Sequence, residues 1–158
     1  MNRFALTTVL VLILPVPVSA ADCEPILEAF RALAARDTYA QIVTMDGSVM
    51  EMRVLPDAMY VNADGQWNSM PGGPEMRQQV LAQILPDESA LTDCKVVGPE
   101  TVGDVATTAY DYVIPELEAI TAGAGTQRLL IRDEDGLPLV LRSPGTEVVI
   151  SYDGVVAP

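Results

Sequence analysis

The chain contains no histidine and few bases. Lysine and arginine together number 9 against 22 acidic residues, so the 158-residue chain carries a net charge of −13. A catalytic triad with a histidine base and a zinc site built on imidazole are therefore excluded. The acidic balance also argues against nucleic acid and anionic membrane surfaces, because both need a basic face on the protein.

Recognisable catalytic motifs are missing as well. The sequence has no glycine-rich phosphate loop and no Cys-x-x-Cys pair. We therefore expect no enzyme activity, no cofactor and no metal site. With 49% apolar residues, the chain is nevertheless long and apolar enough to bury one substantial core.

The first twenty residues have the anatomy of a secretory signal peptide. Arg3 precedes an apolar stretch, and Val18-Ser19-Ala20 supplies the small residues of a cleavage site. Cleavage between Ala20 and Ala21 would leave one domain, residues 21–158, with a net charge of −14 because Arg3 is lost. Asp22 stands where a lipidation motif needs a small residue before the cysteine. The sequence thus predicts a soluble exported protein, which we assign to a bacterial periplasm.

Cys23 and Cys94 are the only cysteines. An even pair in an exported chain predicts a disulfide. The bond would close a loop of about 70 residues and stabilise the fold by at most about 4 kcal/mol in the chain-entropy model.

Apolar periodicity and turn residues predict the secondary structure. Helical spacing marks 25–37 and 74–85, and Asp-Gly pairs at 46–47 and 64–65 mark hairpins. The predicted strands are 38–45, 48–55, 58–62, 66–70, 94–97, 105–114, 126–133, 137–143 and 146–152, with a glycine-rich connection over 116–125. The fold class is therefore α+β: a strongly curved antiparallel sheet of about nine strands, an unclosed half-barrel, covered by two main helices.

One face of the predicted sheet is consistently apolar, and methionines gather near it. All six methionines of the exported chain lie between Met45 and Met76. They could simply fill the core, or they could line an adaptable apolar site. The candidate cavity residues are Met50, Met52, Met59, Leu129, Ile131, Leu139 and Leu141. A weaker alternative is Cu(I) binding, because Met50-x-Met52 places two thioethers on one strand face.

Several segments resemble the periplasmic outer-membrane lipoprotein carriers, the Lol-type localisation factors and their relatives. The resemblance covers nearly the whole exported chain and is carried by architectural segments: the helix 26–36, the hairpin 59–71, the helix 74–85, and residues 109–115, 135–142 and 151–158. It implies an unclosed curved barrel with helices over its mouth and a hollow that holds acyl chains. One feature departs from the pattern: Arg53, the candidate for the arginine that latches the helices of such carriers, alternates to the face opposite the methionines.

The leading functional hypothesis is non-catalytic binding or carriage of an apolar ligand, a lipid or the acyl chains of a lipidated protein. The alternative is a protein-interaction module of the cell envelope with a filled core, acting through an edge strand or its acidic surface. A hollow above about 300 Å³ would favour the ligand, and a filled interior would favour the interaction module.

Overall fold

A computed structural model of the chain describes residues 23–71, 91–114 and 125–158. This part contains one helix and nine strands: α1 (Glu24–Ala34), β1 (Tyr39–Met45), β2 (Ser48–Val54), β3 (Ala58–Ala63), β4 (Gln66–Pro71), β5 (Thr92–Val102), β6 (Val105–Ile114), β7 (Gly125–Arg132), β8 (Pro138–Ser143) and β9 (Thr146–Ser151).

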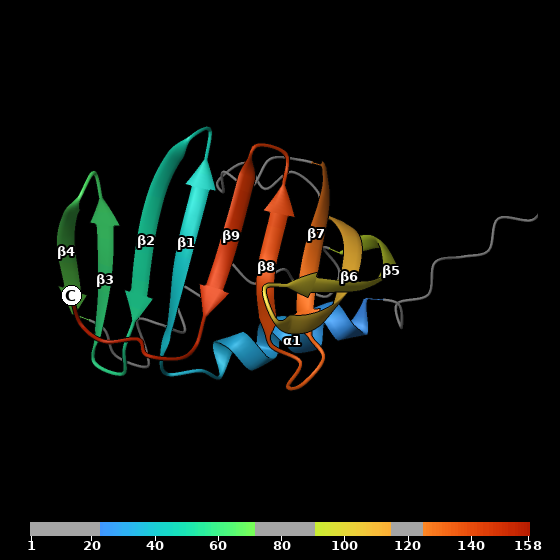
Figure 1. The fold of residues 1–158 in the computed structure, drawn as a ribbon, viewed down its shortest axis with the longest axis horizontal. Coiled ribbons are helices and arrows are strands. Elements are labelled where there is room, and N and C mark those ends of the chain that lie inside the picture. Colours follow the sequence, from blue (N-terminus) through green and yellow to red (C-terminus); the bar gives the residue numbers. More distant parts are fainter. Residues whose placement is uncertain (1–22, 72–90, 115–124) are drawn as a thin grey trace, which may run out of the picture.

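All nine strands form one antiparallel sheet that does not close. Their order is β4-β3-β2-β1-β9-β8-β7-β6-β5, so β4 and β5 are its edges (Figure 1). The first and last strands are neighbours at the centre, where β1 pairs with β9 from Ala40↔Ser151 to Met45↔Thr146. This pairing joins an N-terminal group of strands, β1–β4, to a C-terminal group, β5–β9.

Local sequence explains the hairpins. Asp46-Gly47 and Asp64-Gly65 adopt positive φ at both residues, which is the conformation of the tight turns that match the twist of antiparallel strands. These turns set the pairing of β1 with β2 and of β3 with β4. Both hairpins were predicted from the sequence and are confirmed.

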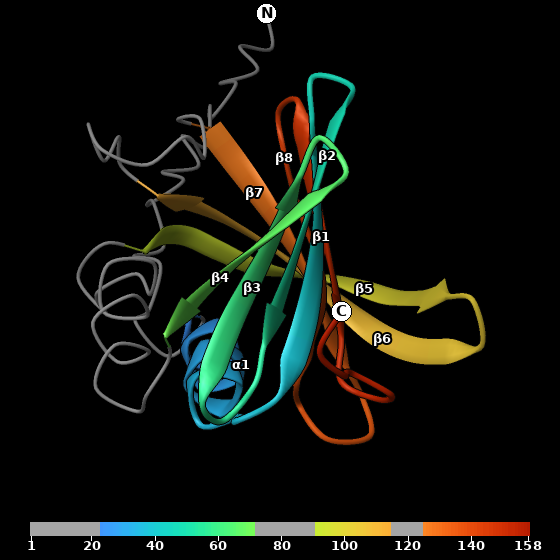
Figure 2. The ribbon, with the colours of Figure 1, turned by 90° about the vertical axis from the view of Figure 1, so that its left-hand side faces the viewer.

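Helix α1 covers one face of the sheet, which we call the inner face. Pro25 occupies its first turn, and its apolar side buries Ile26, Leu27, Ala29 and Leu33. Strands β3–β4 at one end of the sheet and β7 toward the other lean to the side on which α1 lies (Figure 2). The predicted curvature therefore wraps the sheet around this helix.

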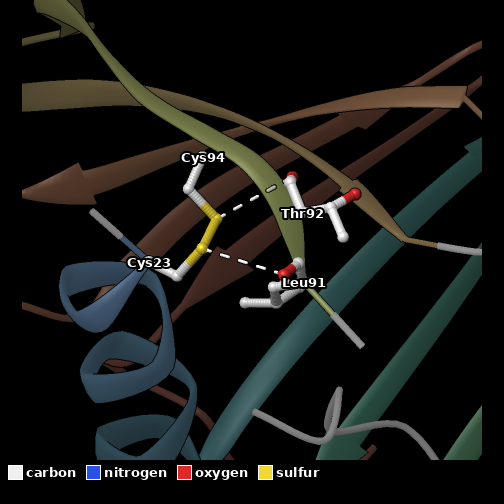
Figure 3. Close-up of a disulfide and its surroundings, with 4 residues drawn as sticks. All are labelled: Cys23, Leu91, Thr92 and Cys94. Atoms are coloured by element: carbon white, nitrogen blue, oxygen red, sulfur yellow. Dashed lines mark hydrogen bonds between the residues drawn. A yellow bond between two sulfur atoms is a disulfide. The ribbon is translucent and has the colours of Figure 1, made fainter. Parts of the chain in front are cut away.

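The predicted disulfide between Cys23 and Cys94 is confirmed (Figure 3). It joins the residue just before α1 to β5, with a Cα–Cα distance of 5.1 Å. The Cys23 sulfur lies 4.0 Å from the Leu91 carbonyl oxygen and the Cys94 sulfur 3.9 Å from that of Thr92. Both cysteines are buried, so the bond fixes the start of α1 to the edge of the sheet inside the core.

The opposite, outer face carries a small second core and a network of charges. The tip of the β5–β6 hairpin lies on the side of the sheet away from α1 (Figure 2). Val102 of this hairpin packs against buried Ala109, Leu130 and Val140.

Ion pairs surround this second core. Arg128 donates to both carboxylate oxygens of Asp111, at 2.8 and 3.1 Å, and to Glu100 at 3.4 Å. Arg142 contacts Glu100 and Glu147. Lys95 lies 3.8 Å from Asp111. Three basic side chains on the outer face are thus paired with three acidic ones: Lys95, Arg128 and Arg142 with Asp111, Glu100 and Glu147.

The remaining sequence predictions fare as follows. The helix is shorter than expected, because it ends at Ala34. Strand β5 is longer, because its pairing with β6 continues through Val102 despite two register shifts between Thr92 and Gly98. The signal peptide 1–20, the second helix 74–85 and most of the connection 116–125 lie outside the described residues. Within the described ranges, no helix has the length and apolarity needed to span a membrane.

We expect removal of the disulfide to destabilise the fold. Replacing Cys23→Ala and Cys94→Ala together should lower the free energy of unfolding by up to about 4 kcal/mol, because the unfolded chain regains the freedom of a long loop. Urea denaturation monitored by circular dichroism measures this loss. The wild-type protein under reducing conditions should match the double variant, and an unchanged unfolding midpoint would contradict the prediction.

The pair of Arg128 and Asp111 should make stability depend on pH. The hydrogen bonds from Arg128 hold the pKa of Asp111 below its usual value of 3.8, against the opposing effect of burial. The stabilisation is therefore present above pH 3.8 and is lost as the pH falls through the folded-state pKa. Wild type should exceed Asp111→Asn in unfolding free energy at neutral pH, and the gap should close in acid.

Denaturant titrations at several pH values test this expectation. Asp153→Asn is the matched control, because Asp153 is exposed and lies outside the network. The difference in unfolding free energy between wild type and Asp111→Asn should shrink as the pH falls below 3.8. If this difference stays constant, the ion pair is not its source.

Candidate functional site

An apolar row crosses the inner face from the N-terminal to the C-terminal group of strands. Direct cross-strand partners continue from β2 to β6 in the order Met50, Val43, Val148, Leu141, Leu129 and Tyr110. Because antiparallel partners point to the same face, the row forms one continuous apolar surface. The two halves of the sheet differ in what covers this surface.

Under α1 the surface is filled. Leu129 is fully buried and Ile131 is 8% exposed, both in a cluster with Ile26, Ala29 and the disulfide. Phe30 of α1 meets the ring of Tyr112 edge to face at 6.4 Å. This half of the inner face is a packed core.

One polar atom in this packed half has no hydrogen-bond partner among the residues that the structure describes. The hydroxyl of Tyr112 is buried and unpartnered, although its ring packs well. Burial raises the pKa of Tyr112 above its ordinary value, so the hydroxyl stays neutral at physiological pH. It can donate a proton in a hydrogen bond but cannot act as a base there.

The described residues cover the β1–β4 half of the inner face only in part. A second cluster of Leu33, Tyr39, Val54, Met59 and Ile150 lies beside the end of α1. Beyond it, Met45, Met50 and Met70 remain 39%, 42% and 44% exposed. Large apolar side chains on this scale of exposure, gathered on one sheet face, are typical of an interaction surface.

Strand register places five methionines on this face. Val43 pairs with Met50 and Gln41 with Met52, and Met59 pairs with Met70. Two-residue alternation puts Met45 on the same face as Val43. We call Met45, Met50, Met52, Met59 and Met70 the methionine face. The two tight Asp-Gly turns fix the register within each hairpin, and the pairing of β2 with β3 aligns the two hairpins with each other.

The structure divides the predicted cavity residues into three places. Met50, Met52 and Met59 belong to the methionine face. Leu129, Ile131 and Leu141 lie in or against the packed cluster under α1. The apolar row connects these two sets through Val43 and Val148.

Leu139 does not join either set. It packs against the outer-face cluster of Ala109, Leu130 and Val140. The sequence alternation of Leu139 with Leu141 fails here because the pairing of β7 with β8 shifts between Leu130 and Ile131, so that Ile131 pairs with Pro138. An irregularity of this kind breaks the two-residue period locally.

Two exposed members of the methionine face, Met45 and Met70, belong to the methionine group noted in the sequence but were not among the candidate cavity residues. Met70 could have been found, because the Asp64-Gly65 turn implies that Met70 faces Met59 across the hairpin. Met45 follows from its alternation with Val43. Both positions can be deduced from the sequence once the register of each hairpin is known.

The described residues also line two polar clefts. One of about 420 Å³ lies beside α1, between Ala29 and Ala32 of the helix and Tyr110 and Ile131 of the sheet, with Glu28, Asp133 and Asp135 among its lining residues. The other, of about 330 Å³, lies between Asp111, Arg128 and Arg142 on the outer face. Charged groups line both, so neither matches the apolar hollow expected from the sequence.

Metal ligands of the usual kinds do not converge in the described part of the chain. No group of three or more histidine, cysteine or acidic side chains there could hold an ion. Both thiols are used in the disulfide. Met50 and Met52 do share the inner face, as the Cu(I) hypothesis requires, and that hypothesis stays a prediction.

Arg53 lies on the outer face, as its alternation predicted. Its partners in register are Ala40 and Tyr60. Its guanidinium stacks on Trp67 at 4.6 Å and donates to the carbonyl of Val156 at 3.0 Å. Arg53 therefore holds the C-terminal segment against the outer face and has no contact with the methionine face.

Comparisons with known proteins support the fold only. No protein-family model matches the chain, and no curated protein matches it in sequence. Among solved structures, the fold is similar to that of the Mycobacterium tuberculosis lipoprotein LppX, with a TM-score of 0.55 over 89% of this chain and 98% of LppX, at 13% identity.

Two other structures are more distant. LprF from Mycobacterium bovis has a TM-score of 0.45 at 13% identity, over 89% of this chain and 95% of LprF. MucB has a TM-score of 0.48 at 16% identity, and the match spans 87% of this chain but only 61% of MucB. The chain thus shares its fold with the lipoprotein LppX, and this likeness does not single out the Lol-type carriers.

Proposed function

We propose that this protein is a non-catalytic binder or carrier of an apolar ligand in the periplasm, and that the ligand's hydrocarbon lies on the methionine face. The observation that carries the proposal is the exposure of Met45, Met50 and Met70 at 39–44% on a sheet face whose other half is closed by α1. The shared fold with the lipoprotein LppX is consistent with it.

The physical basis is burial of hydrocarbon against thioether side chains. Removing apolar area from water contributes roughly 25 cal/mol per Å². Methionine adapts its shape to irregular partners, which suits a flexible acyl chain. The outer face around β5–β8 carries paired bases and acids instead of a methionine cluster.

This placement modifies the hypothesis made from the sequence. The apolar ligand contacts Met50, Met52 and Met59, while Leu129 and Ile131 form the rigid core beneath α1. An acyl chain on the methionine face would therefore extend the apolar row of the sheet beyond α1, on the side of β1–β4.

The second candidate, a protein-interaction module, is favoured by the filled cluster under α1 and by the edge position of β4. An extended peptide from a partner could add to this edge as a further strand. The same methionine face would then receive apolar side chains of the partner.

The first measurement is native mass spectrometry of the protein purified from periplasm without detergent. A co-purifying mass of a few hundred daltons that extracts into organic solvent would establish the carrier. A clean apo mass, together with no binding of a dansyl-labelled fatty acid, would overturn it in favour of the interaction module.

Substitutions on β2 separate the methionine face from general effects. Met50→Gln places an amide in the binding surface, and burying its unpaired polar group should weaken binding of the dansyl-labelled fatty acid about tenfold. Val49→Gln is the matched control, because Val49 is the next residue on the strand, points to the outer face and is 61% exposed. Equal affinities for the two variants would exclude the methionine face as the site.

A further inference from the structure

The methionine face carries thioethers that differ in their access to solvent. Met45, Met50 and Met70 are 39%, 42% and 44% exposed, whereas Met59 is 9% exposed and belongs to the core cluster with Leu33 and Ile150. An oxidant in the surroundings therefore reaches these three side chains more readily than Met59, and the partly buried Met52 is intermediate between the two cases.

We propose that Met45, Met50 and Met70 form an oxidation-sensitive modification site that switches off binding of the apolar ligand. This inference rests on the proposed function. The reagent is a two-electron oxidant of the peroxide class. The lone pair of the methionine sulfur attacks one peroxide oxygen, the O–O bond breaks, and a new S–O bond forms. The sulfur is oxidised to the sulfoxide, and hydrogen peroxide is reduced to water.

Sulfoxide formation changes the chemistry of the face. It turns a flexible apolar side chain into a polar one with a strong hydrogen-bond acceptor. A hydrocarbon ligand cannot satisfy that acceptor, so covering it with an acyl chain costs free energy. The three residues lie on β1, β2 and β4, so oxidation places polar groups on three of the four strands of the methionine face.

The same exposure keeps the fold intact after oxidation. An exposed sulfoxide remains hydrated in the unliganded protein, so its polarity is not buried in the core. Met59 pairs with Met70 across the β3–β4 hairpin but is buried within the second cluster. Its thioether therefore stays unoxidised and continues to stabilise β3. Oxidation thus removes ligand binding without unfolding the sheet, which distinguishes a switch from damage.

Graded treatment with hydrogen peroxide tests the inference. Peptide mass spectrometry should find sulfoxide at Met45, Met50 and Met70 before Met59. Titration with a dansyl-labelled fatty acid should show affinity falling about tenfold or more, while far-ultraviolet circular dichroism stays unchanged. Each sample is compared with the same protein before treatment.

The matched control is the triple variant Met45→Leu, Met50→Leu and Met70→Leu. Leucine preserves volume and apolarity at exposed positions, so the variant should fold, and its affinity for the fatty acid after peroxide is compared with its own affinity before treatment. Its affinity should resist peroxide. A variant that loses affinity to peroxide as wild type does would overturn the inference, because the loss would then arise elsewhere.

Three further outcomes are decisive. Untreated protein that binds the fatty acid and keeps its affinity with all three sulfoxides formed would overturn the switch and leave the proposed function standing. Untreated protein that binds no fatty acid would overturn the proposed function and the switch together. Sulfoxide at Met59 as early as at the other three would refute the selectivity on which the switch depends.

Discussion

Burial of the inner face against α1 is the constraint on which the rest of the structure depends. A nine-stranded antiparallel sheet with one apolar face is stable only if another element covers that face. Here α1 covers the part over β6–β8, and Cys23–Cys94 fixes the start of the helix to β5. The proposed site depends on the limits of this cover, because the methionines of β1, β2 and β4 lie beyond α1 and are partly exposed.

Much of the fold could be predicted from the sequence because its signals are local. The Asp-Gly turns, the alternation in β2 and the pair of cysteines act over short distances or through simple chemistry. The failures were non-local. The shifted pairing of β7 with β8 moved Leu139, and the contact of Glu100 with Arg128 arises because the β5–β6 hairpin lies over the outer face. The local sequence of these strands does not specify either the shifted pairing or the contact of Glu100 with Arg128.

The candidate site was predicted in part for the same reason. Met50, Met52 and Met59 were identified from strand alternation, whereas Leu129 and Ile131 share their apolar pattern but are closed off by α1. Hydrophobicity alone cannot distinguish an apolar side chain that packs in the core from one that stays exposed and can contact a ligand. That distinction depends on the length and position of the covering helix, which is a property of the assembled molecule.

The central position of β1 and β9 has a consequence for how the protein folds. Their paired residues are separated by on the order of a hundred positions in the chain, so this ladder has a high contact order and forms slowly. The β1–β4 meander can assemble from neighbouring hairpins, but its inner edge stays open until β9 arrives. During that interval β1 presents unpaired backbone groups beside an apolar surface, a state prone to aggregation. A chaperone that shields β1 until the last strand emerges would therefore raise the yield of folded protein.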